Sequence, residues 1–254
     1  MDRLGRQGAR ILIERSEPAR SYAEWFETSL GRRVWNDELR ALWRLLRPVP
    51  RSHVLDAGAG DGRLAVELAA EGFRVTALDL SASMLGLAHE RARSTGVPLD
   101  IVQGDIESLP FPPAAFRQVV VVTVLCFLPE PRRALAELTR VLAPGGTLVV
   151  GELGPWSLWN LRRRARGWRG DPLWRRSRFR GRRALKRLAR GAGLIPDGWE
   201  TAVFYSPQTY RCRVSRTLER ILAGRTSLGA AFVAMRAVKP VTKLDGNLRN
   251  KADG

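Results

Sequence analysis

Glycines and carboxylates gather in one short stretch of the chain, Val54 to Arg63, where they could bind a nucleotide-like ligand. An apolar run precedes the glycines and a helical pattern follows them, which predicts a strand, a tight turn and a helix. Gly58 and Gly60 permit positive φ angles and a close approach of the ligand to the backbone amides at the helix start. A dinucleotide fingerprint would need another glycine where Arg63 stands, so the spacing disfavours a hydride-transferring dehydrogenase.

Three carboxylates follow three successive predicted strands. Asp56 ends the first strand, Asp79 ends the apolar run 73–78, and Asp105 follows the run 101–104. Open α/β sheets bind ligands at the carboxyl ends of their strands, and an acid about twenty residues beyond a glycine loop can accept both hydroxyls of a ribose. The pattern therefore predicts a nucleoside-binding edge, with Asp79 as the ribose ligand.

Four segments in order resemble the motifs of class I S-adenosylmethionine (SAM)-dependent methyltransferases. They are Val54–Gly62, Ala77–Leu85, Gln103–Phe111 and Arg140–Leu148. The subgroup with the greatest similarity contains the ubiquinone/menaquinone and many natural-product small-molecule methyltransferases, and the resemblance covers roughly residues 22 to 152 motif by motif.

This resemblance implies an α/β fold, Rossmann-like, with seven mostly parallel strands in the order 3-2-1-4-5-7-6 and helices on both faces. It implies SAM as the cofactor and S-adenosylhomocysteine as its product. The cofactor-binding residues that it implies are Tyr22, Asp56, Ala57, Gly58, Gly60, Asp79, Leu80, Met84, Gly104, Asp105, Ile106 and Thr123.

The sequence also offers candidates for catalytic and substrate-binding residues, on patterns less specific than those of the cofactor residues. Glu152, at the end of the predicted strand 147–151, is a candidate base or substrate-orienting group, and a solvated or arginine-paired carboxylate is the alternative. Tyr22 and Tyr205 are the other catalytic candidates. Candidate substrate contacts are Cys126, Trp156, Trp159 and Tyr210. No group of histidines and acids stands at metal-ligand spacing, so no metal is expected.

The predicted organisation is a flexible arm (1–20), a methyltransferase domain (21–240) and a disordered tail (241–254). N-terminal helices span 21–46 with a break around Gly31. Further predicted strands are 119–125, 199–205 and 230–238, and further predicted helices are 82–95, 131–143, 182–191 and 209–223.

An insertion at about 154–180 is rich in arginine and tryptophan, and we expect it to form the substrate lid. Aromatic side chains among arginines suit an anionic membrane surface, an anionic ligand or single-stranded nucleic acid. A solvated basic face with its aromatics turned inward is the alternative. The formal net charge of +18 fits any polyanion.

The predicted function is transfer of a methyl group, by in-line displacement, to a small-molecule acceptor. The alternatives are a lipid or quinone acceptor at the membrane surface and a non-catalytic module that binds SAM or nucleic acid. A nucleic-acid substrate is disfavoured because neither the Asp/Asn-Pro-Pro-aromatic signature nor a Pro-Cys or Thr-Cys context occurs. We expect a cytoplasmic protein, with peripheral membrane contact as an option and monomer and homodimer both open.

Overall fold

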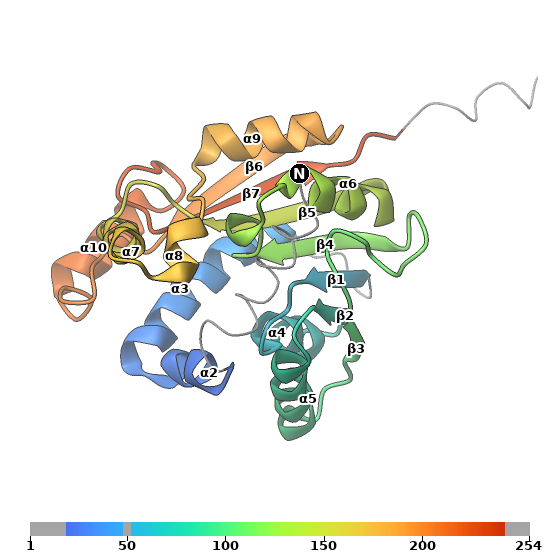
Figure 1. Ribbon diagram of the computed structural model, residues 1–254, viewed down its shortest axis with the longest axis horizontal. Helices are drawn as coiled ribbons and strands as arrows, with labels where there is room; N and C mark the ends of the chain where they lie inside the picture. Colours follow the sequence, from blue (N-terminus) through green and yellow to red (C-terminus); the bar gives the residue numbers. More distant parts are fainter. Residues whose placement is uncertain (1–18, 48–51, 242–254) are drawn as a thin grey trace, which may run out of the picture.

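A seven-stranded sheet runs through the molecule in the order β3-β2-β1-β4-β5-β7-β6 (Figure 1). The structure, a computed structural model, describes residues 19–47 and 52–241. Its strands are β1 (His53–Ala57), β2 (Arg74–Asp79), β3 (Asp100–Gln103), β4 (Phe116–Val122), β5 (Leu142–Leu153), β6 (Ile195–Ala202) and β7 (Phe232–Val238). All neighbouring pairs are parallel except those of β7, which is antiparallel to both β5 and β6. This confirms the predicted fold class and strand order.

Helices cover both faces of the sheet (Figure 1). They are α2 (Ala19–Glu27), α3 (Ser29–Leu46), α4 (Arg63–Ala70), α5 (Ala82–Thr95), α6 (Pro131–Val141), α7 (Leu158–Trp168), α8 (Pro172–Arg176), α9 (Arg182–Gly191) and α10 (Arg213–Leu222), with a 3-10 turn η1 (Leu125–Phe127). Two buried clusters form the core. One joins the sheet to α6 and α9, and the other joins it to α3 and α4.

Several predicted element boundaries are wrong, and three of the errors have a clear local cause. β4 ends at Val122 because Thr123 adopts a positive φ of 52° and the 3-10 turn follows. β6 ends at Ala202 because Val203 has a φ of 65°. Hydrogen-bonded turns occupy 206–212, so α10 begins four residues later than predicted. The predicted arm and tail lie outside the described residues except at 19–20 and 241.

The predicted helix break at Gly31 is also wrong. The break lies at Thr28, whose hydroxyl caps α3 by accepting a hydrogen bond from the Gly31 backbone N–H. Gly31 itself lies inside α3, where a Cβ atom would approach the Trp25 carbonyl oxygen to 2.1 Å and the Phe26 Cα to 2.7 Å. The glycine is needed because α2 and α3 meet there, and α2 in turn borders the cavity described below.

We expect Gly31→Ala to lower the free energy of unfolding by about 1–3 kcal/mol, because its methyl group would press on backbone atoms of α2. Gly86→Ala is the matched control, since Gly86 is also inside a helix and its Cβ would meet nothing within 4 Å. The control should raise stability by about 0.5–1 kcal/mol, the usual helix preference for alanine. If chemical denaturation showed Gly31→Ala to stabilise the protein as much as Gly86→Ala does, the close approach of α2 to Gly31 would be contradicted.

Candidate functional site

A cavity of about 610 Å³ opens at the carboxyl ends of β1, β2 and β4. Its walls come from the loops after these strands, from α2 and α3, and from α7 and α8 of the arginine-rich insertion. The volume falls within the range of about 300–1,000 Å³ that is usual for small-molecule sites.

The turn after β1 is shaped by a close contact at Gly58. This residue has a φ of 86°, and a Cβ atom there would lie 2.3 Å from Cγ2 of Val124. The backbone N–H groups of Gly58 and Ala59 both donate to the Leu78 carbonyl, at 2.7 and 2.9 Å, which ties the turn to β2. The turn is therefore a rigid floor on which a ligand can lie against backbone.

Asp79 lies at the centre of this floor. Its Oδ2 accepts a hydrogen bond from the Gly60 N–H at 2.8 Å, and its Oδ1 accepts one from the Ser81 N–H at 2.9 Å. A carboxylate offers about four acceptor positions, so capacity for further donors remains. Burial raises the pKa of Asp79, and the backbone hydrogen bonds act in the opposite direction.

Asp56 contributes a second carboxylate to the cavity. Its side chain is buried, and Oδ2 has no hydrogen-bond partner among the described residues. Burial raises its pKa to about 7, with the neighbouring charges of Asp79 and Asp61 adding to the effect. An unpartnered buried carboxylate oxygen is costly and is well suited to a cationic or hydrogen-bond-donating ligand.

The other predicted cofactor residues lie around this floor with one exception. Those that line the cavity with Asp56 and Asp79 are Tyr22, Gly58, Gly60, Leu80, Met84, Gly104, Asp105, Ile106 and Thr123. Ala57 is fully buried and does not line the cavity. Thr123 holds its positive φ with an N–H to Gly151 carbonyl hydrogen bond of 2.7 Å, and such backbone strain is concentrated at functional sites.

Aromatic rings and two opposite charges also line the cavity, on side chains from α2, α3, η1, α7 and α8. The rings belong to Tyr22, Trp25, Phe26, Trp35, Phe127, Trp159 and Trp174. The charged groups are Glu38 of α3 and Arg163 of α7. The Arg163 guanidinium lies 5.0 Å from the Trp174 ring centroid and 5.7 Å from that of Trp159, and it donates to Asn160 Oδ1 at 2.7 Å.

Glu38 makes no hydrogen bond or ion pair with any described residue. Burial raises its pKa to about 8, an effect that the charge of Arg163 opposes. A carboxyl group with this pKa exchanges a proton near neutral pH, where general acid–base catalysis is most effective.

Glu152, the predicted base, lies outside the cavity. Its side chain is fully buried, Oε1 accepts from the Cys126 N–H at 3.2 Å, and Oε2 is 3.9 Å from Nη1 of Arg180. That guanidinium also donates to the Leu125 carbonyl at 2.6 Å. Glu152 therefore fastens the 3-10 turn to the segment after α8, which matches the arginine-paired alternative.

Cys126, a predicted substrate contact, is also fully buried and does not line the cavity. Burial raises the pKa of its thiol well above the usual range, with the nearby charge of Glu152 adding to the effect.

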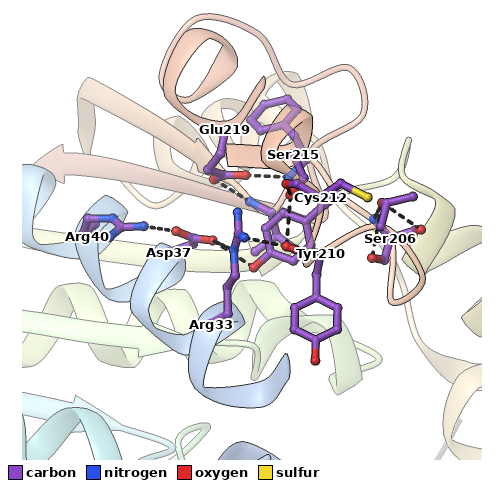
Figure 2. Close-up of polar contacts among 12 residues, drawn as sticks. Arg33, Asp37, Arg40, Ser206, Tyr210, Cys212, Ser215 and Glu219 are labelled. Carbon is purple, nitrogen blue, oxygen red and sulfur yellow. Dashed lines mark hydrogen bonds and ion pairs between the residues drawn. The ribbon is translucent and has the colours of Figure 1, made fainter. Parts of the chain in front are cut away.

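Tyr205, the third catalytic candidate, belongs to a polar cluster around Asp37 of α3, and Figure 2 labels Asp37 with Arg33 and Arg40. Its hydroxyl donates to Oδ2 of the buried Asp37 at 2.8 Å, and Arg33 and Arg40 pair with the same carboxylate. The Arg33 guanidinium lies 4.5 Å from the centroid of the Tyr205 ring. Burial raises the pKa of Tyr205 far above that of a free tyrosine. Tyr205 thus anchors the loop after β6 to α3 and has no free hydroxyl for catalysis.

Of the remaining predicted substrate contacts, one lines the cavity and two do not. Trp159 lines the cavity, and its indole N–H donates to the Tyr205 carbonyl at 2.7 Å. Trp156 is 64% exposed and does not line the cavity. The Tyr210 hydroxyl pairs with Ser29 Oγ at 2.8 Å and lies outside the cavity.

We expect Tyr205→Phe to cost about 1–2 kcal/mol of unfolding free energy, because the buried Asp37 carboxylate loses one donor. Turnover and SAM affinity should change little. Tyr210→Phe, at an exposed hydroxyl, is the control and should lie within about 0.5 kcal/mol of the parent. A hundredfold loss of turnover at unchanged stability would restore Tyr205 as a catalytic residue.

Sequence reasoning missed Glu38 as a site residue. A signal was present, since Glu38 is four residues after Val34 and three after Trp35, both of which line the cavity. A carboxylate on the apolar face of a helix, at i+3 and i+4 from core positions, points toward the interior. Arg163 is one of many arginines in the 154–180 insertion, and no sequence pattern distinguishes it from the others.

Within residues 19–47 and 52–241, no cluster of three or more histidines, cysteines and acids could hold a metal ion. No helix in the same ranges is both long and apolar enough to cross a membrane.

Comparison with known proteins agrees with this geometry. Residues 55–150 match the sequence profile of the methyltransferase domain family. An uncharacterised protein of Mycobacterium tuberculosis is 31% identical over 220 residues, which cover 87% of this chain and 72% of that protein. The chain belongs to the class I SAM-dependent methyltransferase family.

Relatives with curated names match a shorter part of the chain. Demethylmenaquinone methyltransferase of Clavibacter sepedonicus is 38% identical over 121 residues, 47% of this chain and 49% of that protein. The chain spans about half the length of the curated relatives of this name that it matches. A SAM-dependent methyltransferase from Thermotoga maritima shares the fold, with a TM-score of 0.67 at 23% identity over 90% of this chain and 99% of that one.

Proposed function

We propose that the protein transfers the methyl group of SAM to a small acceptor bound in the same cavity. The observation that carries this proposal is that the cavity lining combines two chemically distinct sets of residues, which come from different elements and which we call its two halves. One half presents the glycine turn with Asp56 and Asp79, and the other presents aromatic rings with Glu38 and Arg163. A binding module for SAM alone would not need the second half.

The first half fits SAM. Asp79 has acceptor capacity left for the two ribose hydroxyls, and Leu80 and Met84 offer apolar surface beside it for the adenine. The unpartnered Oδ2 of Asp56 suits the cationic amino-acid end of the same molecule. Each of these contacts is a role that we propose for residues of this chain.

The second half fits a planar acceptor. Trp25, Trp159 and Trp174 offer faces and edges against which a ring can pack. Arg163 can bind an anionic or electron-rich oxygen on that ring, and Glu38 can take its proton. The similarity to proteins named demethylmenaquinone methyltransferase favours a hydroxylated aromatic ring as the acceptor class.

In this reaction the protein does not need to activate the methyl group. SAM supplies an activated methyl group, whose bond to sulfur breaks as the acceptor atom forms its new bond to carbon. The walls of the cavity hold the acceptor in line and exclude water, and alignment of this kind accounts for much of enzymatic rate enhancement. Glu38 accepts the proton that the acceptor loses, so the product leaves uncharged.

Isothermal calorimetry with SAM, S-adenosylhomocysteine and NAD tests the cofactor half directly. We expect saturable 1:1 binding of the first two and none of NAD, because Arg63 replaces the third glycine of a dinucleotide turn. Binding of NAD in preference to SAM would overturn the proposal.

A further inference from the structure

Exposed apolar side chains are concentrated on one part of the surface. Eight of the eleven exposed large hydrophobic residues among the described ones lie in α7, α10 and the loops beside them. They are Trp156, Leu158, Leu161, Trp168, Val214, Leu218, Ile221 and Leu228, and we call them the apolar surface. When exposed apolar residues gather in one region of a protein surface, that region is commonly an interaction site.

On α7 the exposed residues form a helical stripe. Leu158, Leu161 and Trp168 recur at intervals of three and seven residues and are 62%, 53% and 79% exposed. The opposite face of the helix is turned inward, with Asn160 and Gly167 buried. The solvent-facing side of the helix therefore carries an apolar stripe beside its exposed arginines.

On α10 the arrangement repeats. Val214, Leu218 and Ile221 recur at intervals of four and three residues and are exposed, while Ser215 and Glu219 are buried on the other side. A helix that only needed to cover the core would turn the apolar side inward. Both helices thus present an apolar stripe that nothing in the described chain covers.

The two stripes belong to one end of the molecule. Figure 1 shows α7 and α10 together beyond the carboxyl end of β5. The Gly229 N–H donates to the Trp156 carbonyl at 2.8 Å, and Arg162 Nη1 donates to Gln208 Oε1, also at 2.8 Å. These contacts join the loops on both sides of α10 to the segment that carries α7.

The charge around the apolar surface is strongly positive. Segments 156–176 and 207–229 contain twelve arginines and two acids, Asp171 and Glu219. Asp171 caps α8 and pairs with Arg166 at 2.8 Å. Glu219 is buried and accepts from the N–H groups of Val203 and Phe204 at 2.9 and 2.8 Å. Asp171 therefore offsets one arginine and Glu219 is held by backbone groups, so a large excess of positive charge remains.

We propose that the apolar surface docks on an anionic lipid membrane. Amphipathic helices with apolar residues on one side and flanking arginines lie in the membrane interface, where the apolar side chains enter the acyl boundary. Long arginine side chains reach from that depth to the lipid phosphates. The excess of arginine on both helices selects an anionic surface over an uncharged one.

The position of α7 connects this surface to the cavity. Its outward side carries Leu161 and Trp168, and its other side gives Trp159 and Arg163 to the cavity lining. An acceptor with an apolar tail could therefore pass from the membrane to the cavity along one helix. This last step rests on the proposed function, whereas docking itself does not.

Flotation with phosphatidylcholine vesicles, with and without phosphatidylglycerol, tests docking in the absence of SAM and acceptor. We expect binding that requires the anionic lipid and weakens with salt. Serine substitutions at Leu161 and Trp168, or at Val214, Leu218 and Ile221, should each reduce partitioning about tenfold or more, because they remove the inserted groups. Ile195→Ser with Val241→Ser is the matched control, since both residues are exposed and lie outside α7 and α10.

Two results would overturn the proposal. The first is absence of vesicle binding. An equal loss of partitioning in the control variant would count in the same way, because it would show that the apolar surface has no special role in binding. The second is a dimer in light scattering that the same serine variants convert to monomer, because a second copy would then cover the surface. Docking by a protein that fails to bind SAM would leave the inference intact and count against the proposed function alone.

Discussion

Asp79→Asn is expected to weaken SAM binding about 100-fold or more, the largest effect of a single cofactor-site substitution. The ionised carboxylate would accept both ribose hydroxyls, and a hydrogen bond to a charged group contributes about 1.5–3 kcal/mol. Asparagine removes the charge and one acceptor. It also leaves an N–H of Gly60 or Ser81 without its present partner, so a loss of stability of about 1–3 kcal/mol accompanies the change.

Calorimetry and thermal unfolding together separate these two effects. Asp100→Asn is the matched control, because Asp100 lies on the strand next to β2 but is exposed and pairs with Arg74 at the surface. It should bind SAM like the parent. Unchanged SAM affinity in a folded Asp79→Asn protein would refute the ribose assignment.

Glu38→Gln is expected to lower kcat by about 10²–10⁴, the usual contribution of a positioned general base. SAM affinity should be retained because Glu38 lies in the aromatic half of the cavity. Glutamine keeps the size of the side chain but does not accept a proton near neutral pH, so the loss of kcat measures the contribution of proton transfer. Glu24→Gln, at an exposed acid of α2, is the control and should retain full activity.

The pH profile gives an independent test of Glu38. Its pKa is raised to about 8, and a base works only in its ionised form. The value of kcat/KM should therefore rise through pH 8, level off above it, and fall about tenfold for each unit of pH below it. A Glu38→Gln protein should lose this rise. A profile that keeps the same inflection in the variant would assign the titration to another group.

The half of the cavity that we propose for SAM was predictable because the residues that form it are close together in the sequence. The turn after β1 and the acid at the end of β2 each follow a strand directly, and the carboxyl ends of parallel strands meet at one edge. Strand order followed from the same motifs through the family resemblance. Gly58 and Asp79 accordingly lie where the sequence predicts.

The acceptor half was less predictable because side-chain direction depends on packing. Neighbouring residues of a strand point to opposite faces, and on β5 it is Leu153 that lines the cavity while Glu152 is buried behind it. Tyr205 lies just beyond β6, where its contact with Asp37 joins residues 168 positions apart. No local pattern encodes that contact.

The apolar surface shows a different limit of prediction from the sequence. The arginines and tryptophans of 154–180 are evident in the sequence, whereas the pattern of 209–223, which contains α10, predicts only a helix. Which side of an amphipathic helix faces solvent is decided by what the rest of the chain offers to cover it. On α10, burial of Glu219 and exposure of Leu218 reverse the usual orientation.

Incubation of the protein with methyl-labelled SAM and a cell extract, followed by separation into lipid, aqueous small-molecule and macromolecular fractions, tests the account most directly. We predict label in a small molecule of the lipid fraction, absent with Asp79→Asn and strongly reduced with Glu38→Gln. Label confined to macromolecules would contradict the account, as would an unlabelled extract with a protein that binds SAM and carries an intact cavity.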